Sequence, residues 1–154
     1  MTEHPAESGF TLLETICVLA VIAMLAAIVL PAIPHATSRT ALEAYALKTA
    51  ALLKSDRNAA VRNGSTVQTE LSQLSGTIRS GASGRVVVQL PADVTFNAIL
   101  ASQCGGHASG AAIEFLPSGM SCGGTIFLSR PGAGFEIRIT WLTGGVEVVP
   151  ANAL

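Results

Sequence analysis

The chain has 154 residues, of which 49% are hydrophobic and only 12% are charged, with a mean hydropathy of +0.52. This composition excludes a disordered chain, and the length suits one modest domain with one additional segment. Residues 34–154 hold nine basic and seven acidic residues, a net charge of +2. Such a near-neutral domain argues against an electrostatic nucleic-acid binder, which normally presents a basic face.

An apolar run occupies residues 16–33 and extends to 10–33 when the apolar residues just upstream are included. As a helix with a rise of about 1.5 Å per residue, the longer segment measures ~36 Å, enough to span a bilayer with tilt. A cleaved secretory signal is the competing interpretation, but residues 1–9 contain no Lys or Arg and no A-x-A pattern follows the run. The sequence therefore predicts a retained membrane helix over 10–33.

Glu14 places a carboxylate near the start of this segment. One interpretation is that it lies at headgroup depth and marks the end of the helix, since carboxylates inside membranes are costly. The motif G-F-T-L-L-E before an apolar helix, however, resembles the type IV prepilin signature. That resemblance implies cytoplasmic cleavage between Gly9 and Phe10 by a prepilin peptidase, N-methylation of the new terminus, and pairing of Glu14 with that amine in a neighbouring subunit. The leader differs from family leaders, which usually carry Lys or Arg.

The segment 38–63 is predicted to be an amphipathic helix, with Ser38 as its N-cap and Asn63-Gly64 as its stop signal. Its apolar positions recur at three- and four-residue spacing: Leu42, Tyr45, Ala46, Leu52, Leu53 and Ala60. The polar positions Lys48, Lys54, Asp56 and Arg57 are assigned to a solvated face. We expect this helix and the membrane helix to form one long spine, bent near Pro31 and Pro34.

From residue 65 the pattern changes to short β-branched or alternating segments separated by Gly, Pro and Ser. The predicted strands are 65–71, 85–91, 94–100, 111–117, 124–130, 135–142 and 144–150. Because one amphipathic helix precedes them, we expect an antiparallel sheet with one face covered by that helix.

Cys104 and Cys122 lie eighteen residues apart, each beside a glycine pair that favours a turn. In an oxidising compartment they can form a disulfide, which would stabilise the domain by ~3 kcal/mol in the chain-entropy model. Free thiols in a reducing cytosol are the alternative, although the periplasmic placement that the prepilin resemblance implies favours the disulfide. Cys17 lies in the apolar run, where a thiol behaves as a small hydrophobe.

No catalytic, cofactor or metal site is predicted. The motif G-M-S-C-G at 119–123 matches a nucleophile elbow around Ser121, but a strand follows it and no histidine lies beyond His107. The histidines lack the spacing of metal ligands. The sequences GASGR and PGAGF lack the strand–helix context of a phosphate loop. The chain is therefore not expected to be an enzyme.

The C-terminal half resembles the minor pseudopilins of the H class of type II secretion, the GspH/FimT pseudopilin family. The matching residues are Phe115, Pro117, Gly119, Gly123, Gly124, Ile126, Leu128, Thr143, Gly144 and Val146. The resemblance implies an α+β, type IV pilin-like fold. A long N-terminal helix, its membrane part at 10–33 and its amphipathic part at 34–64, would pack on an antiparallel β-sheet head at 65–154.

The same resemblance implies a minor pseudopilin, a subunit of the filament that moves folded exoproteins through an outer-membrane channel. It would cross the inner membrane once, with a cytoplasmic N-terminus and a periplasmic head. Its partners would be other pseudopilins, the prepilin peptidase, the inner-membrane assembly platform and an exoprotein, with no cofactor. The alternative is a FimT-like minor pilin that binds DNA. Because the only basic residues beyond 85 are Arg130 and Arg138, secretion is favoured.

Overall fold

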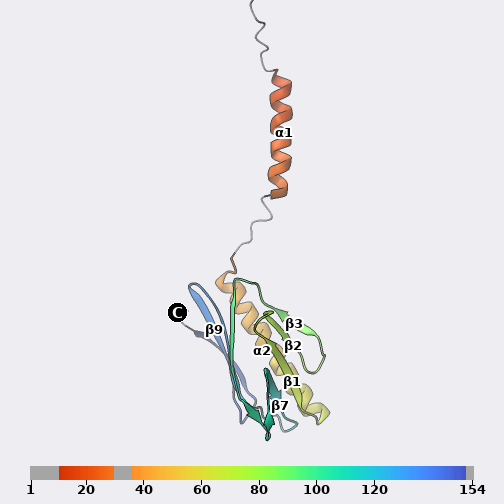
Figure 1. Cartoon of the computed structure of the whole chain (residues 1–154), viewed down its shortest axis with the longest axis vertical. Helices are drawn as coiled ribbons and strands as arrows, with labels where there is room; N and C mark the ends of the chain where they lie inside the picture. The colour runs from red at the N-terminus through yellow and green to blue at the C-terminus, as the bar shows by residue number, and fades with distance from the viewer. Residues whose placement is uncertain (1–10, 30–35, 152–154) are drawn as a thin grey trace, which may run out of the picture. The chain divides into compact units, whose positions relative to one another are not determined.

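The computed structural model describes residues 11–29 and 36–151, which fall into two units divided after residue 35 (Figure 1). The described helix of the first unit is α1 (Leu12–Val29). The second unit, the head, begins with α2 (Arg39–Asn63). Its strands are β1 (Val67–Ser72), β2 (Thr77–Arg79), β3 (Val86–Gln89), β4 (Thr95–Leu100), β5 (Gln103–Cys104), β6 (His107–Ala108), β7 (Ala112–Phe115), β8 (Gly124–Arg130), β9 (Ala133–Ile139) and β10 (Val146–Ala151).

Helix α1 begins at a threonine cap and exposes its apolar side chains. The hydroxyl of Thr11 accepts from the Glu14 amide at 3.3 Å, and the side chains of residues 11–26 are all exposed. The large apolar ones are Leu12, Leu13, Ile16, Val18, Leu19, Val21, Ile22, Met24 and Leu25. Among the helices of 11–29 and 36–151, none combines the length and apolarity that crossing a membrane requires.

Helix α2 has the ends that the sequence predicts. The Ser38 hydroxyl accepts from the Ala41 amide at 3.1 Å, and Gly64 closes the helix in the left-handed region with φ 62°. Five of the six predicted apolar positions are buried and the sixth, Tyr45, packs on the core half-buried. The predicted spine would join α1 to α2 through Pro31 and Pro34, which lie outside the described residues.

The strands form two four-stranded antiparallel sheets rather than one. Their orders are β3-β2-β1-β7 and β10-β9-β8-β4, and β5 pairs with β6 in a small hairpin. Helix α2 packs against strands of both sheets. The core that the helix and the sheets share is filled by fully buried residues such as Leu53, Ile78, Phe115, Ile126 and Ile137. The expected helix-on-sheet layer is confirmed, with the strands divided between two sheets.

The start of α2 is fastened to the connection between β3 and β4. The Asp93 carboxylate accepts from the Thr37 backbone N–H at 2.6 Å and from the Thr37 hydroxyl at 2.8 Å. The hydrogen bond from the Thr37 N–H is the main cause that lowers the pKa of Asp93 below its ordinary value of 3.8, and the bond from the Thr37 hydroxyl is the second. The carboxylate form is therefore favoured by folding.

This contact predicts a pH-dependent contribution to the stability of the head. A carboxyl whose pKa falls on folding stabilises the native state above its unfolded pKa, and the contribution disappears as pH drops through the lower folded value. The melting temperature of the wild type should exceed that of Asp93→Asn at neutral pH, and the difference should shrink below about pH 4. Circular dichroism melts of both proteins measure it; a difference that stays constant under acid would contradict the assignment.

Candidate functional site

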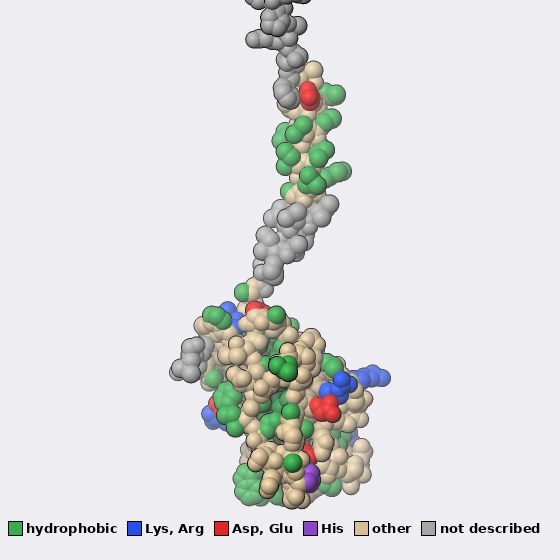
Figure 2. Space-filling model, viewed as in Figure 1, with side chains coloured by type: hydrophobic (Ala, Val, Ile, Leu, Met, Phe, Trp, Pro, Cys, Tyr) green, Lys and Arg blue, Asp and Glu red, His purple; other side chains and the backbone are tan. Residues whose placement is uncertain are grey.

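The two residues of the predicted cleavage site, Gly9 and Phe10, lie outside the described residues. Glu14 lies in the first turn of α1 and is exposed. A carboxylate there interacts favourably with the positive end of the helix dipole. In Figure 2 the side chains coloured along α1 are predominantly apolar, with a carboxylate at one end. Within its own unit, α1 therefore carries one exposed carboxylate and exposed apolar side chains.

Several residues of the C-terminal motif meet around one arginine of α2. The Arg57 Nε donates to the carbonyl oxygen of Gly119 at 2.9 Å and to that of Thr143 at 3.1 Å. Gly119 lies in the loop between β7 and β8, whereas Thr143 lies in the turn between β9 and β10. We call this arrangement of Arg57, Gly119, Thr143 and Gly144 the arginine clasp. It ties two loops to one point on the helix.

The clasp explains two of the motif glycines. Gly144 has φ 60° and is packed so closely that a Cβ would overlap the Gly119 carbonyl oxygen. Gly119 has φ 83°, and a Cβ there would lie 3.1 Å from Arg57 Nη2. Both positions are in the left-handed region, which glycine adopts without a steric penalty. A side chain at Gly144 would push the two loops apart, whereas one at Gly119 would crowd the Arg57 guanidinium.

The other motif residues support the sheets beside the clasp. Phe115, Ile126 and Leu128 are core residues, and Val146 packs against that core. Gly124 is the first residue of β8, and Gly123 comes directly before it. Pro117 is exposed in the preceding loop. The Ser121 amide donates to Trp141 O at 2.9 Å, and its hydroxyl accepts from the Gly123 amide at 2.9 Å. Ser121 thus shapes a turn.

The prediction that Asp56 lies on the solvated face of the helix is wrong. Its side chain is 0% exposed, whereas Lys48 and Lys54 are exposed as expected. The carboxylate accepts from the hydroxyls of Thr69 and Ser80 at 2.7 and 2.6 Å and from the Gly81 amide at 2.9 Å. Because these donors come from β1 and the β2–β3 loop, Asp56 fastens the helix to one sheet while the adjacent Arg57 fastens it to the loops of both.

Replacing Arg57 should loosen the two loops that it holds. Arg57→Ala is expected to lower the free energy of unfolding by about 2 kcal/mol, because hydrogen bonds to charged groups contribute about 1.5–3 kcal/mol each and the helix position is partly exposed. Urea denaturation of the head measures the loss. Arg62→Ala, an exposed arginine in the last turn of the same helix, is the control and should change stability by less than about 0.5 kcal/mol. Equal losses in both variants would refute the clasp.

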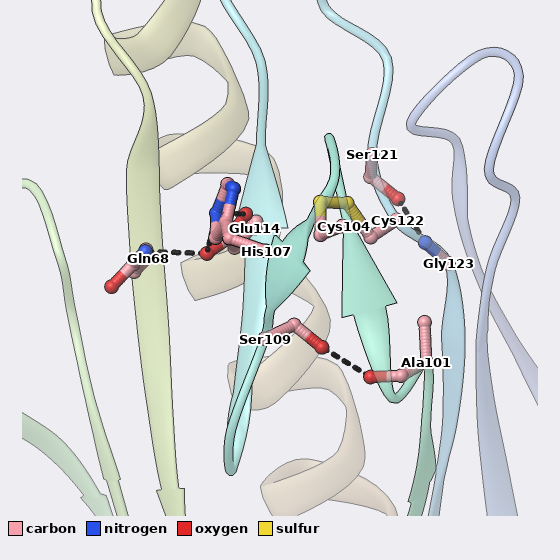
Figure 3. Close-up of a disulfide and its surroundings, with 9 residues drawn as sticks. All are labelled: Gln68, Ala101, Cys104, His107, Ser109, Glu114, Ser121, Cys122 and Gly123. Atoms are coloured by element: carbon pink, nitrogen blue, oxygen red, sulfur yellow. Dashed lines mark hydrogen bonds and ion pairs between the residues drawn. A yellow bond between two sulfur atoms is a disulfide. The ribbon is translucent and has the colours of Figure 1, made fainter.

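Cys104 and Cys122 are joined in a disulfide, with their Cα atoms 5.5 Å apart. Figure 3 shows the bond between the β5–β6 hairpin and the segment that leads into β8. Beside it, the buried Glu114 of β7 accepts from the Gln68 side-chain amide and lies 3.3 Å from His107 Nε2. Cys17 of α1 is exposed and unpaired.

The comparisons with known proteins agree with both parts of this description. Residues 5–30 match the prokaryotic N-terminal methylation motif. The structure is similar to the type IV minor pilin FimU of Pseudomonas aeruginosa, with a TM-score of 0.53 and 18% identity over 74% of this chain and 92% of that chain. It is also similar to the minor pseudopilin EpsH of the Vibrio cholerae Type 2 Secretion System, with a TM-score of 0.53 and 11% identity over 70% and 95%. No curated protein matches the sequence significantly.

The motif at residues 5–30 and the fold of the head are both found in pilin-like proteins. The chain combines this motif with a type IV pilin-like fold, built as an N-terminal helical segment followed by a head of one helix and antiparallel sheets.

Proposed function

We propose that this chain is a minor pseudopilin of the H class, a structural subunit of a type II secretion pseudopilus that helps to move folded exoproteins through an outer-membrane channel. The observation that carries the proposal is the combination of a prepilin methylation motif at 5–30 with a head whose C-terminal motif residues converge on the arginine clasp. Its partners would be other pseudopilins, the prepilin peptidase, the inner-membrane assembly platform and an exoprotein.

The exposed apolar side chains of α1 suit two environments, a lipid bilayer and a bundle of similar helices. A helix with exposed apolar side chains is stable in lipid or among similar helices, but unfavourable in water. The helix would therefore reside in the inner membrane before assembly, with the head in the periplasm, and in a bundle of neighbouring helices afterwards. Glu14 would pair there with the N-terminal amine of the next subunit, because an unpaired charge in low dielectric is strongly disfavoured.

A minor type IV pilin is the second candidate, favoured by one observation: the identity to the minor pilin FimU, 18%, exceeds the 11% to EpsH. The two candidates differ in the system that they serve. Deletion of the gene should block release of exoproteins if the chain is a pseudopilin, and should impair pili or DNA uptake if it is a minor pilin. Neighbouring secretin and secretion ATPase genes, or pilus and competence genes, provide an independent observation.

DNA binding by the head is not favoured by its charges. Three of the seven described arginines are engaged within the head: Arg57 is part of the clasp, Arg79 lies 3.3 Å from Glu70, and Arg138 binds Glu136 at 2.8 Å. On the face drawn in Figure 2, the Lys and Arg side chains of the head are dispersed rather than gathered in one patch. A protein that neutralises several phosphates needs its cations on one surface.

Processing provides a direct test of the prepilin assignment. We expect the chain to be cut between Gly9 and Phe10, since the residues 9–14 read G-F-T-L-L-E before an apolar helix. Intact-mass analysis of protein extracted from membranes should show loss of residues 1–9, with one added methyl group on the new terminus. A mature protein that starts after Ala32 or Ala36 would instead identify an ordinary signal peptide and overturn the pilin-like processing.

A further inference from the structure

Three of the edge strands in the two four-stranded sheets are protected against further pairing. The edges are β3 and β7 of one sheet and β10 and β4 of the other. Strand β7 is covered, because the Cys122 amide donates to the carbonyl oxygen of Glu114 at 3.2 Å. Strand β10 contains Pro150, and β3 has only four residues and an irregular register against β2. Short strands, bulges and prolines are common means of preventing unwanted pairing at a sheet edge.

Strand β4 has none of these protections. Its six residues read TFNAIL, with no proline and no charged side chain, and they pair with β8 without a shift in register. An edge strand of this kind presents a row of unpaired N–H and C=O groups to another extended chain. Among the sheet edges of residues 36–151, β4 is therefore the open one.

The backbone groups that β4 directs toward β8 can be identified from the hydrogen-bond pattern of the sheet. The Thr140 amide donates to the carbonyl oxygen of Gly145 at 2.9 Å, where β9 turns into β10. In an antiparallel sheet, one residue bonds to the strand on one side and the next residue bonds to the strand on the other. When this alternation is followed back along β9 and across the paired residues of β8, the β4 residues that bond to β8 are Thr95, Asn97 and Ile99.

The alternate residues Phe96, Ala98 and Leu100 direct their backbone N–H and C=O groups to the open side of β4. Within residues 36–151, the one hydrogen bond to these groups is a long one, from Gln73 Nε2 to the Ala98 carbonyl oxygen at 3.4 Å. This contact agrees with the outward direction of the Ala98 carbonyl. Since Gln73 is exposed, its side chain can swing away from the edge.

Two recesses flank the open edge, one near each end of β4. The recess of about 460 Å³ is lined by residues that include Leu90, Val94 and Phe96, and the recess of about 310 Å³ by residues that include Leu71, Leu74 and Leu100. The two positions on β4 are four residues apart, a distance of about 13 Å in a strand. Gln73 lines both recesses and separates them at the level of Ala98.

We propose that the edge of β4 binds an extended segment of a partner polypeptide as an added antiparallel strand. Three alternate residues of the segment lie opposite Phe96, Ala98 and Leu100, and each exchanges two backbone hydrogen bonds with the residue that it faces. Their side chains lie on the same face of the sheet as those of Phe96 and Leu100. The first and third enter the two recesses, whereas the second lies beside Gln73.

The surroundings of the edge determine which segment fits. The described residues that line the recesses include no charged side chain, and a charge buried there without a partner would be costly. The segment therefore carries apolar residues at positions i and i+4, with a small residue at i+2. The turn between β1 and β2 reaches the edge through Gln73, so the space suits one narrow strand. A second head would bring its own β1–β2 turn to the same place.

The test uses the full chain in detergent and a fluorescein-labelled peptide, Thr-Val-Thr-Ala-Thr-Val-Thr. One derivative is N-methylated at the two valines and the alanine, whose N–H groups face β4, and another at three of the threonines, whose N–H groups face away. We expect saturable binding by fluorescence anisotropy, with a loss of affinity of at least ~10-fold for the first derivative only, because it lacks three hydrogen bonds. Equal affinities of the two derivatives would overturn the proposal.

Ala98→Pro tests the same edge from the side of the protein. Proline has no N–H, and its ring occupies the open side of the strand, but the bonds of β4 to β8 remain because the Ala98 N–H is not among them. Peptide affinity should fall by at least ~10-fold, with little change in the circular dichroism melt. Ile99→Thr alters an exposed side chain of the same strand and should bind as the wild type. Gln73→Ala should bind at least as tightly, since it frees the Ala98 carbonyl.

Two further results would count against the proposal. The first is the absence of saturable binding by the unmodified peptide. The second is a dimer of the full chain, detected by sedimentation in detergent, that Ala98→Pro dissociates, because a second copy would then occupy the edge. If Ala98→Pro does not fold, the two N-methylated peptides decide the question on the wild-type chain.

Discussion

Asp56→Ala should lower the free energy of unfolding of the head by about 3 kcal/mol, because each buried polar group left without its partner costs about 1–3 kcal/mol. The change removes the acceptor for the hydroxyls of Thr69 and Ser80 and for the Gly81 amide, all held at 2.6–2.9 Å. Thr69 is 0% and Ser80 3% exposed, so water cannot easily replace the carboxylate. Urea denaturation followed by circular dichroism measures the loss.

Two variants make this experiment specific. Glu43→Ala removes an exposed carboxylate from the same helix and should change stability by less than about 0.5 kcal/mol. Asp56→Asn keeps one carbonyl acceptor and should be less damaging than Asp56→Ala. The assignment fails if Asp56→Ala is as stable as the Glu43 control, or if the asparagine and alanine variants are equally destabilised.

Glu14→Val should abolish assembly while leaving membrane association intact. The substitution increases the apolarity of the N-terminal helix, so the mutant should still fractionate with the inner membrane. It removes the proposed partner of the Phe10 amine in the next subunit, whose positive charge would then be buried without compensation. Co-purification with other pilin-like subunits, scored by immunoblotting, should drop to background.

Glu7 offers a matched control for that experiment. It is also a carboxylate near the N-terminus, but it lies in the segment 1–9 that cleavage would remove. Glu7→Val should therefore assemble normally once processed. Normal incorporation of Glu14→Val would show that the carboxylate only marks the helix end. A failure of both variants would instead point to a defect in processing or insertion.

The elements with a strong local signal could be predicted from the sequence. Helix α2 has both of its caps in the sequence, Ser38 and Gly64, and its apolar spacing identifies the buried face correctly. The seven predicted strand segments each overlap an observed strand, and the ends differ by at most three residues. Strand β2 was missed because Thr77–Arg79 has only three residues, and β5 and β6 have two each, too short to show a period.

The arginine clasp and the buried carboxylate could not be predicted in the same way. Asp56 and Arg57 follow Lys54 in a polar stretch of α2, and composition alone assigns such a stretch to solvent. Their partners, Thr69, Ser80, Gly119 and Thr143, are between 13 and 86 residues away along the chain. Burial of a charge depends on donors that only the tertiary structure brings together. The signal available in the sequence was the pair of motif glycines, whose close packing implies that another group approaches them.

The Asp93 contact has a mechanical consequence for the filament subunit that we propose. Any pull transmitted along the backbone from the N-terminal segment reaches the head at Thr37, just before the first turn of α2. Since both the N–H and the hydroxyl of Thr37 are held by Asp93, the load divides there between the helix and the connection between β3 and β4. Tension is thus shared with the sheets before it can unwind α2 from its first turn.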